Sequence, residues 1–208
     1  MKISYAVTVC NEFEEIQRLI PFLLENKRHQ DEIVVLFDQK NGSSEVLDYL
    51  LKFNKLPNVQ TWRGFEFEND FAQWKNLLTT YCAGDYVFQI DADEIPHKSL
   101  MANLPVLLET NNVEVLRVPR VNTVDGLTRA HVEKWRWVVD DSGRVNWPDP
   151  QWRVYKRTSE IKWKNKVHEV LHGYKTYADL PYEEEWSLYH PKDIKKQEKQ
   201  NNFYEDIQ

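Results

Sequence analysis

Apolar residues in the first 100 positions follow two alternating patterns, unbroken runs and runs at helical spacing. The unbroken runs predict buried parallel strands over residues 3–9, 32–37, 59–62 and 86–90. The helical spacing predicts helices over residues 14–26 and 45–53, and a third whose apolar stripe runs from Trp74 to Tyr81. Because strands and helices alternate with short turns, the pattern predicts an α/β fold with a doubly wound, mostly parallel sheet.

The pattern changes after residue 112, where strand-like segments replace the alternation. These segments predict a smaller mixed β region, with strands over residues 113–118, 151–157, 161–168 and 186–190. Residues 121–150 form a loop-rich stretch between them, and the charged pattern of residues 192–207 predicts a terminal helix. We expect one domain over residues 1–208, made of two halves that meet near residue 112.

Three carboxylates, Asp91, Asp93 and Glu94, directly follow the strand predicted over residues 86–90. In open α/β sheets, ligands bind in the crevice at the carboxyl ends of the strands. Uncompensated acids at that place would repel one another. A hard divalent cation that also touches a phosphate-bearing substrate is the simplest way to neutralise them.

Composition narrows the class of protein further. The 208 residues carry a formal net charge of −6, with acidic and basic residues mixed along the chain. This charge pattern lacks the basic patch that nucleic-acid-binding proteins carry. The apolar run at the amino terminus is too short for a secretory or membrane-spanning segment, so we expect a soluble, intracellular protein. Cys10 and Cys82 are expected to be reduced packing residues, without a disulfide.

Four segments, in order, resemble family 2 glycosyltransferases of the GT-A fold. They are residues 6–12 (AVTVCNE), 34–38 (VVLFD), 71–76 with 83–87, and the Asp-Ala-Asp of residues 91–93. More loosely, residues 153–157, 166–169 and 189–190 resemble small bacterial and viral sugar transferases related to lipopolysaccharide core enzymes. The resemblance implies metal-dependent transfer of a hexose-type sugar from a UDP-sugar to a hydroxyl of a glycan or glycolipid acceptor. It also implies the cytoplasm of a bacterium or of a virus-infected host cell.

The resemblance assigns the nucleotide half to residues 1–112 and the acceptor half to residues 113–208. The residues expected to bind the nucleotide sugar are Thr8, Asn11, Glu12, Asp38, Lys75, Asp91, Ala92 and Arg153. Asp38 would accept the imide proton of uracil, although a turn aspartate is the alternative. Lys75, where the family usually has Arg, and Arg153 are candidate phosphate partners or else surface cations. Glu12 is otherwise a helix acid that offsets the dipole.

Metal and catalytic roles follow from the same resemblance. We expect Mn²⁺ or Mg²⁺ to bind Asp93 directly, with Asp91 acting through water or on the ribose and His190 completing the shell. An inverting transfer needs a carboxylate that takes the proton of the acceptor hydroxyl. Glu169 is the expected base, and Asp141, with Asp140, is the competing candidate. His168 is expected to contact the acceptor or the diphosphate, unless it is a structural histidine.

The sequence is also compatible with three other functions. A retaining glycosyltransferase shares the metal site, a nucleotidyltransferase would ordinarily begin with a Gly-rich basic loop, and a carbohydrate-binding protein would not require the clustered acids. Six of the eight tryptophans fall between residues 135 and 186. These rings either line a sugar site or fill the core of a small sheet.

Overall fold

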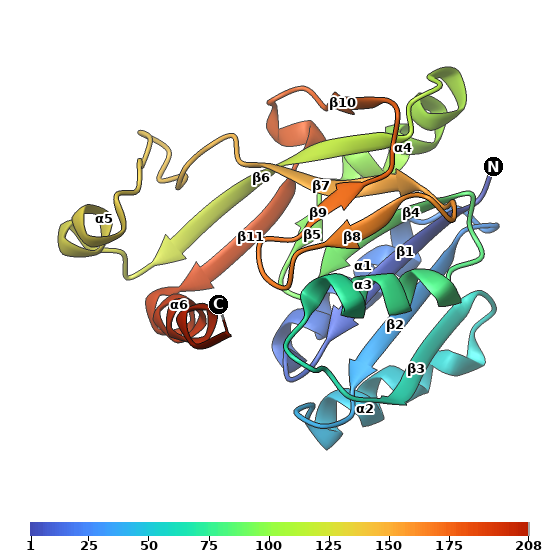
Figure 1. The fold of residues 1–208 in the computed structure, drawn as a ribbon, viewed down its shortest axis with the longest axis horizontal. Coiled ribbons are helices and arrows are strands. Elements are labelled where there is room, and N and C mark those ends of the chain that lie inside the picture. The colour runs from blue at the N-terminus through green and yellow to red at the C-terminus, as the bar shows by residue number, and fades with distance from the viewer. Residues whose placement is uncertain (208) are drawn as a thin grey trace.

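A nine-stranded sheet runs through the chain with the order β3-β2-β1-β4-β7-β6-β11-β5, and β10 pairs with β6 (Figure 1). The computed structural model describes the backbone of residues 1–207 and the side chains of residues 1–199 and 201. The strands are β1 (Ile3–Val9), β2 (Glu32–Asp38), β3 (Val59–Phe65), β4 (Tyr86–Asp91), β5 (Ile95–Pro96), β6 (Val115–Asp125), β7 (Pro150–Lys156), β10 (Tyr177–Asp179) and β11 (Leu188–Asp193). A separate pair is formed by β8 (Lys162–Lys164) and β9 (Val170–His172).

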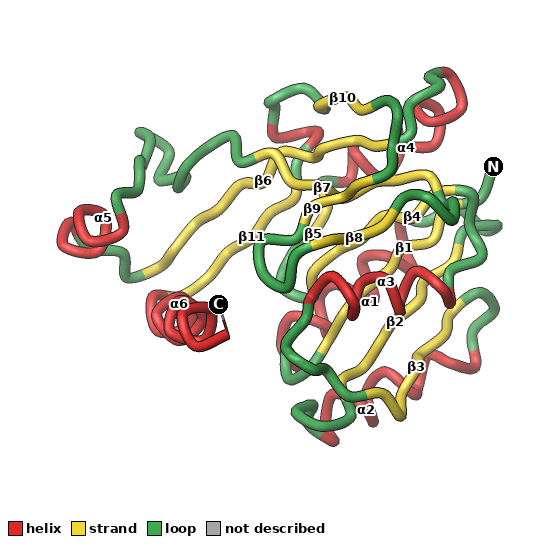
Figure 2. The backbone as a smooth tube through the Cα atoms, viewed as in Figure 1, coloured by secondary structure: helices red, strands yellow, loops and turns green. Residues whose placement is uncertain are grey.

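Helices cover both faces of the sheet, which makes the fold doubly wound (Figure 2). One face is covered by α1 (Phe13–Asn26), α2 (Ser44–Leu51) and α4 (Lys98–Thr110), and the other by α3 (Phe71–Tyr81) together with β8 and β9. Short 3₁₀ helices follow α2 (Lys52–Lys55) and precede β11 (Glu184–Trp186). The apolar stripe of α1, including Ile16 and Leu19, is fully buried. Each such side chain contributes about 1.5 to 3 kcal/mol to the free energy of unfolding.

Five of the eight strand pairings in the large sheet are parallel and three are antiparallel. The predicted α/β fold with a doubly wound, mostly parallel sheet is therefore confirmed. The second half of the chain extends the same sheet through the antiparallel pairing of β7 with β4. As a result, β1, β2, β4, β6 and β11 all run in one direction, and their carboxyl ends face the same side as α6 (Ile194–Ile207) (Figure 1).

The predicted elements of residues 1–90 lie within a few residues of their expected positions, whereas β5 and α4 were not predicted. Ser43 caps α2 and Asp70 caps α3, each by accepting a hydrogen bond from a backbone N–H. Both cysteines are free thiols, as expected. No helix among the described residues is long and apolar enough to cross a bilayer.

The second half departs from the prediction in several places, including the unpredicted strands β9 and β10. The strand expected over residues 161–168 ends at Lys164, because Asn165 and His168 have left-handed backbone, with φ of 75° and 54°. Part of the stretch expected to be loop has regular secondary structure. The strand β6 continues to Asp125 alongside β11, and α5 occupies Arg129–Trp135. The terminal helix begins two residues later than expected, so His190 lies inside β11 rather than at its end.

Candidate active site

A cavity of about 920 Å³ lies at the carboxyl ends of the parallel strands. Residues that follow β1, β2 and β4 form one side of it, and residues of β6, β7, β11 and the loop before β9 form the other. This is the edge at which open α/β sheets bind their ligands. All but one of the residues predicted to form the site line this cavity: Thr8, Asn11, Glu12, Asp38, Lys75, Asp91, Ala92, Asp93, Arg153, His168, Glu169 and His190.

Asp91, the last residue of β4, is held by two cations. Its Oδ2 accepts a hydrogen bond of 2.6 Å from Nη2 of Arg153, and its Oδ1 lies 3.3 Å from Nζ of Lys75. Burial alone would raise the pKa of Asp91, but the charges of Arg153 and Lys75 hold this pKa below its usual range. The acid cluster is thus compensated within the protein, contrary to the premise of uncompensated carboxylates.

Arg153 also binds Glu94, which is fully buried. Its Nε and Nη2 donate to the two carboxylate oxygens of Glu94 at 3.0 and 2.7 Å, in the bidentate geometry that suits a guanidinium. The β6–β7 register shifts between Leu116 and Arg117, opposite Arg153, and such a bulge re-aims a side chain. Arg153 therefore braces the loop after β4, in addition to any contact with phosphate.

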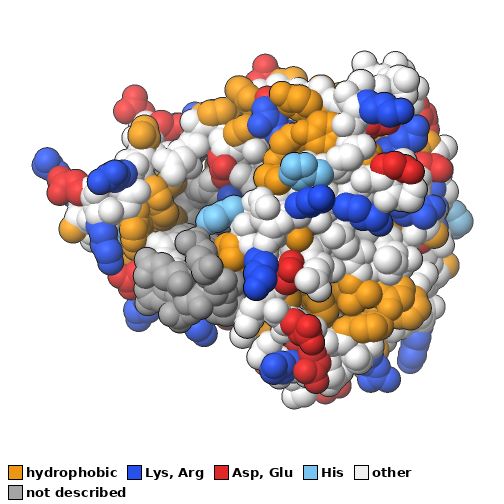
Figure 3. Space-filling view, viewed as in Figure 1, with side chains coloured by type: hydrophobic (Ala, Val, Ile, Leu, Met, Phe, Trp, Pro, Cys, Tyr) orange, Lys and Arg blue, Asp and Glu red, His pale blue; other side chains and the backbone are white. Residues whose placement is uncertain are grey.

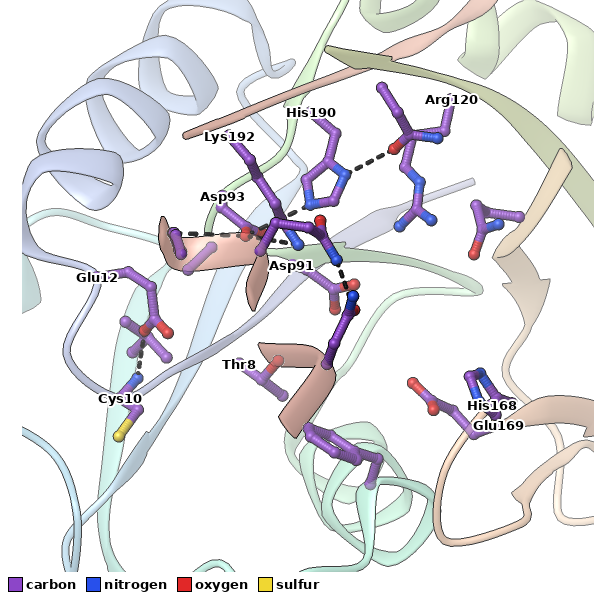
Figure 4. A pocket seen from close by; sticks show the side chains of 18 of the residues that line it. Thr8, Cys10, Glu12, Asp91, Asp93, Arg120, His168, Glu169, His190 and Lys192 are labelled. Atoms are coloured by element: carbon purple, nitrogen blue, oxygen red, sulfur yellow. Dashed lines mark hydrogen bonds and ion pairs between the residues drawn. The ribbon is translucent and has the colours of Figure 1, made fainter. Parts of the chain in front are cut away.

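Asp93 and His190 lie side by side in the cavity lining, with Oδ2 of Asp93 3.4 Å from Nε2 of His190 (Figure 4). Nδ1 of His190 lies 2.7 Å from Oδ1 of Asn122, whose Nδ2 donates to Asp149. Burial lowers the pKa of His190 below its ordinary value, although a hydrogen bond to Asp93 acts in the opposite direction.

Glu169 lies on the loop before β9, with His168 beside it, across the cavity from Asp93 and His190 (Figure 4). Its Oε1 accepts a hydrogen bond from Nζ of Lys75. Lys75 is only 2% exposed. Lys75 thus lies beneath Glu169 and Asp91 instead of on the surface, which excludes the surface-cation alternative.

At the β1 and β2 end of the cavity the side chains are held by the backbone. Oε2 of Glu12 accepts hydrogen bonds from the amides of Cys10 and Asn11. Asp38 is 3% exposed. Its carboxylate accepts hydrogen bonds from the backbone amides of Lys40 and Phe67 and from the side-chain amide of Asn41. Asp38 therefore organises the turn after β2 while also lining the cavity.

Residues 4–184 of the chain match the family model described as "Glycosyl transferase family 2". The match covers most of the chain, including β1, the acid cluster and Glu169. The chain belongs to glycosyl transferase family 2. A search of curated protein sequences finds no significant match.

Solved structures support the GT-A fold of this family 2 chain. It is similar to residues 1–349 of TarS from S. aureus, with a TM-score of 0.63 and 13% identity over 92% of this chain and 60% of that one. A crystal structure of the same TarS fragment in complex with UDP-GlcNAc gives a TM-score of 0.65 and 14% identity, over 92% and 58% of the two chains. The family 2 chain thus spans about 60% of the TarS fragment, and at this identity the likeness establishes the fold alone.

Asp141 is the one predicted site residue that is not among the described residues lining the cavity. Its side chain is exposed, on the long connection between α5 and β7. The neighbouring Asp140 accepts a hydrogen bond of 2.7 Å from Nε of Arg144. Of the carboxylates proposed as base, only Glu169 shares the cavity with the acids after β4.

Several residues that line the cavity or contact its lining received no role from the sequence. The main ones are Glu94, Arg120, Asn122, Asp149, Lys192 and Lys196. Lys192 and Lys196 lie 3.8 and 3.5 Å from Oδ2 of Asp93. Glu94 alone carried a local signal, since it belongs to the acid cluster. The others come from distant segments that no spacing rule connects to it.

The tryptophans of the second half divide between the two expectations. Trp163 is buried with α3 in the core, and Trp186 packs against the opposite face. Trp137 and Trp152 line the cavity. A sugar-lining role is thus open to two of the six rings, and packing accounts for at least two others.

Proposed function

We propose that the protein is a glycosyltransferase that moves a hexose-type sugar from a UDP-sugar to a hydroxyl of a glycan acceptor, with inversion. The observation that carries this proposal is the shared cavity of Glu169, Asp91 and Asp93 in a chain of family 2. TarS, a protein of similar fold, has been crystallised with UDP-GlcNAc, which supports a UDP-sugar donor.

In the proposed reaction, residues after β1 and β2 bind the nucleoside, and Asp91 with its partners lies toward the diphosphate. The acceptor oxygen attacks the anomeric carbon, the new C–O bond forms, and the bond to the diphosphate oxygen breaks. Glu169 takes the proton of the attacking hydroxyl. Lys75 orients the Glu169 carboxylate for that step through their hydrogen bond.

Asp93 and His190 fit a divalent cation such as Mn²⁺ or Mg²⁺. Nε2 of His190 and Oδ2 of Asp93 lie 3.4 Å apart, so a cation bound there would have one nitrogen ligand and one oxygen ligand from the protein. Among the described residues, no group of three or more His, Cys, Asp and Glu side chains is placed to hold a metal, so the remaining ligands would be diphosphate oxygens and water. A bound cation would supply charge neutralisation for the leaving diphosphate.

The test of the function is release of nucleoside diphosphate from a panel of UDP-, GDP- and dTDP-sugars, with Mn²⁺ and with a mixture of glycan acceptors. We expect turnover of a UDP-sugar, and proton NMR of the product should show an anomeric configuration opposite to that of the donor. Retained configuration would favour the retaining alternative. Glycan binding without turnover of any donor would favour a non-catalytic carbohydrate-binding protein.

A further inference from the structure

Three aromatic rings and one guanidinium form a group at the edge of the cavity, which we name the aromatic shelf: Trp152, Tyr174, Tyr177 and Arg117. The ring centre of Trp152 lies 5.4 Å from that of Tyr174 and 5.7 Å from that of Tyr177. Cζ of Arg117 lies 5.3 Å from the centre of the Trp152 ring and 5.4 Å from that of Tyr177. These distances are those of direct aromatic and cation–π contacts.

Strand pairing sets the arrangement of the shelf. Trp152 of β7 pairs with Arg117 of β6, which in turn pairs with Asp179 of β10. Nε and Nη2 of Arg117 donate to the two carboxylate oxygens of Asp179 at 2.6 and 2.7 Å. Trp152, Arg117 and Tyr177 therefore come from three neighbouring strands of the main sheet, and Tyr174 comes from the loop before β10.

The shelf is open to solvent at its outer end. Tyr177 is 54% exposed, whereas Trp152 is partly covered and lines the cavity. Figure 3 shows hydrophobic side chains gathered beside basic ones over the region of β7 and β10. Trp152 thus joins an exposed aromatic surface to the cavity that holds Glu169.

Exposed rings beside a planar Arg–carboxylate pair match the chemistry of a pyranose. The C–H face of a sugar packs on aromatic rings, while its hydroxyls find donors and acceptors in guanidinium and carboxylate groups. A lipid chain would gain nothing from the Arg117–Asp179 pair, because its methylene groups offer no hydrogen-bond donors or acceptors. The shelf therefore favours a carbohydrate occupant.

We propose that the aromatic shelf binds a second sugar of the acceptor, while the sugar that receives the transfer lies in the cavity near Glu169. This inference rests on the proposed function and deepens it. Because Trp152 is shared by both places, one chain of sugars can extend from the cavity to Tyr177. The acceptor is then an oligosaccharide of at least two residues rather than a monosaccharide.

The test uses the full chain, with UDP and Mn²⁺, on an array of immobilised mono-, di-, tri- and tetrasaccharides. We expect binding to oligosaccharides and weaker binding to the monosaccharide that forms their end. Tyr177→Ala should weaken oligosaccharide binding about 5-fold or more, as expected for loss of one aromatic contact, and Tyr177→Phe should restore it. The control is Leu56→Ala, which should bind oligosaccharides like the unaltered protein, because Leu56 is also exposed, at 42%, but precedes β3 at the other end of the sheet.

The proposal is overturned if no oligosaccharide binds, if monosaccharides bind as tightly, or if Tyr177→Ala binds like the unaltered protein. Hydrolysis of UDP-sugars without acceptor separates this failure from failure of the proposed function. If the unaltered protein hydrolyses a UDP-sugar and any of those three results is found, the proposed sugar site on the shelf is wrong and the proposed glycosyltransferase function stands. Absence of donor turnover with every acceptor removes the glycosyltransferase itself.

Discussion

The ammonium group of Lys75 in α3 donates a hydrogen bond to the carboxylate of Glu169, 94 positions later in the chain. The same ammonium lies 3.3 Å from Asp91 and 4.9 Å from the centre of the Trp163 ring. One buried cation therefore holds both the expected base and the first acid of the Asp-Ala-Asp motif. This geometry indicates that Lys75 positions Glu169 and Asp91, a role different from the direct phosphate contact expected from the sequence.

Glu169→Gln is expected to lower turnover roughly 100-fold or more, because it removes the proton acceptor while keeping size and hydrogen bonding. The affinity for UDP should be unchanged when measured by calorimetry. Asp141→Asn is the matched comparison, since Asp141 is the competing carboxylate and is exposed. If Asp141→Asn abolishes turnover and Glu169→Gln does not, the base is Asp141 carried by a moving loop.

Lys75→Met is expected to lower kcat more than it raises the KM for the donor, because it releases Glu169 from its hydrogen bond. Lys75→Arg keeps the charge and should recover part of the loss. Steady-state kinetics and UDP calorimetry on both variants check this, with melting temperatures as the control for folding. A rise in the UDP dissociation constant with kcat unchanged would contradict the positioning role and return Lys75 to phosphate binding.

Strand-end reasoning predicted many of the residues that line the cavity, because the carboxyl ends of parallel strands must meet at one edge of the sheet. Thr8, Asp38 and Asp91 fall into this class. The compensation of the acids could not be predicted, since Arg153 meets Asp91 from 62 positions away and only after β7 has paired antiparallel with β4. Local patterns carry no information on such pairings.

Differences in the fold have equally specific causes. The helix α4 was not predicted, although Leu100, Leu104 and Leu108 have helical spacing and are buried. The long strand β6 was predicted only in part, since its second half is partly exposed and pairs with β11, far along the chain. Tertiary pairing decides such segments, whereas the buried strands of the first half are decided by their own composition.

Manganese is expected to tighten UDP binding through Asp93 and His190, because a cation held by these two side chains would add positive charge beside the diphosphate. Asp93→Ala should remove the gain in affinity that Mn²⁺ provides. Calorimetry of UDP with Mn²⁺ and with a chelator measures this gain, and electron paramagnetic resonance of Mn²⁺ reports metal binding without turnover. Asp140→Ala, at a carboxylate paired with Arg144, is the control. Equal UDP affinity with Mn²⁺ and with chelator would remove the metal site.

Asp38→Asn is expected to reduce both stability and UDP affinity, because the Asp38 carboxylate accepts hydrogen bonds from Lys40, Phe67 and Asn41. The loss in unfolding free energy should be about 1 to 3 kcal/mol, as for hydrogen bonds to a charged group. Denaturant unfolding and calorimetry measure the two effects separately. Unchanged UDP affinity in a destabilised variant would leave Asp38 as a turn residue only.

The pH dependence of stability has a source at the opposite edge of the sheet, at Glu32 in β2. Its buried carboxylate accepts hydrogen bonds of 2.6 Å from both Nζ of Lys2 and Oγ of Ser4, and one from the amide of Ala83. Burial alone would raise the pKa of Glu32, but these hydrogen bonds lower the pKa below its ordinary value. The folded state thus favours the ionised form, so the stabilisation is full above the unfolded pKa and is lost as pH falls through the folded pKa.

Glu32→Gln is accordingly expected to lower the unfolding free energy by about 1 to 3 kcal/mol at pH 7, because a charged acceptor becomes a neutral amide. The difference between variant and unaltered protein should shrink as pH falls below about 4, where Glu32 becomes protonated in the unfolded chain and then in the folded one. Urea unfolding at several pH values measures it, and turnover at pH 7 and 25 °C is the control, since Glu32 is remote from the cavity. A difference that stays constant from pH 7 to pH 3 would mean that ionisation of Glu32 contributes nothing to stability.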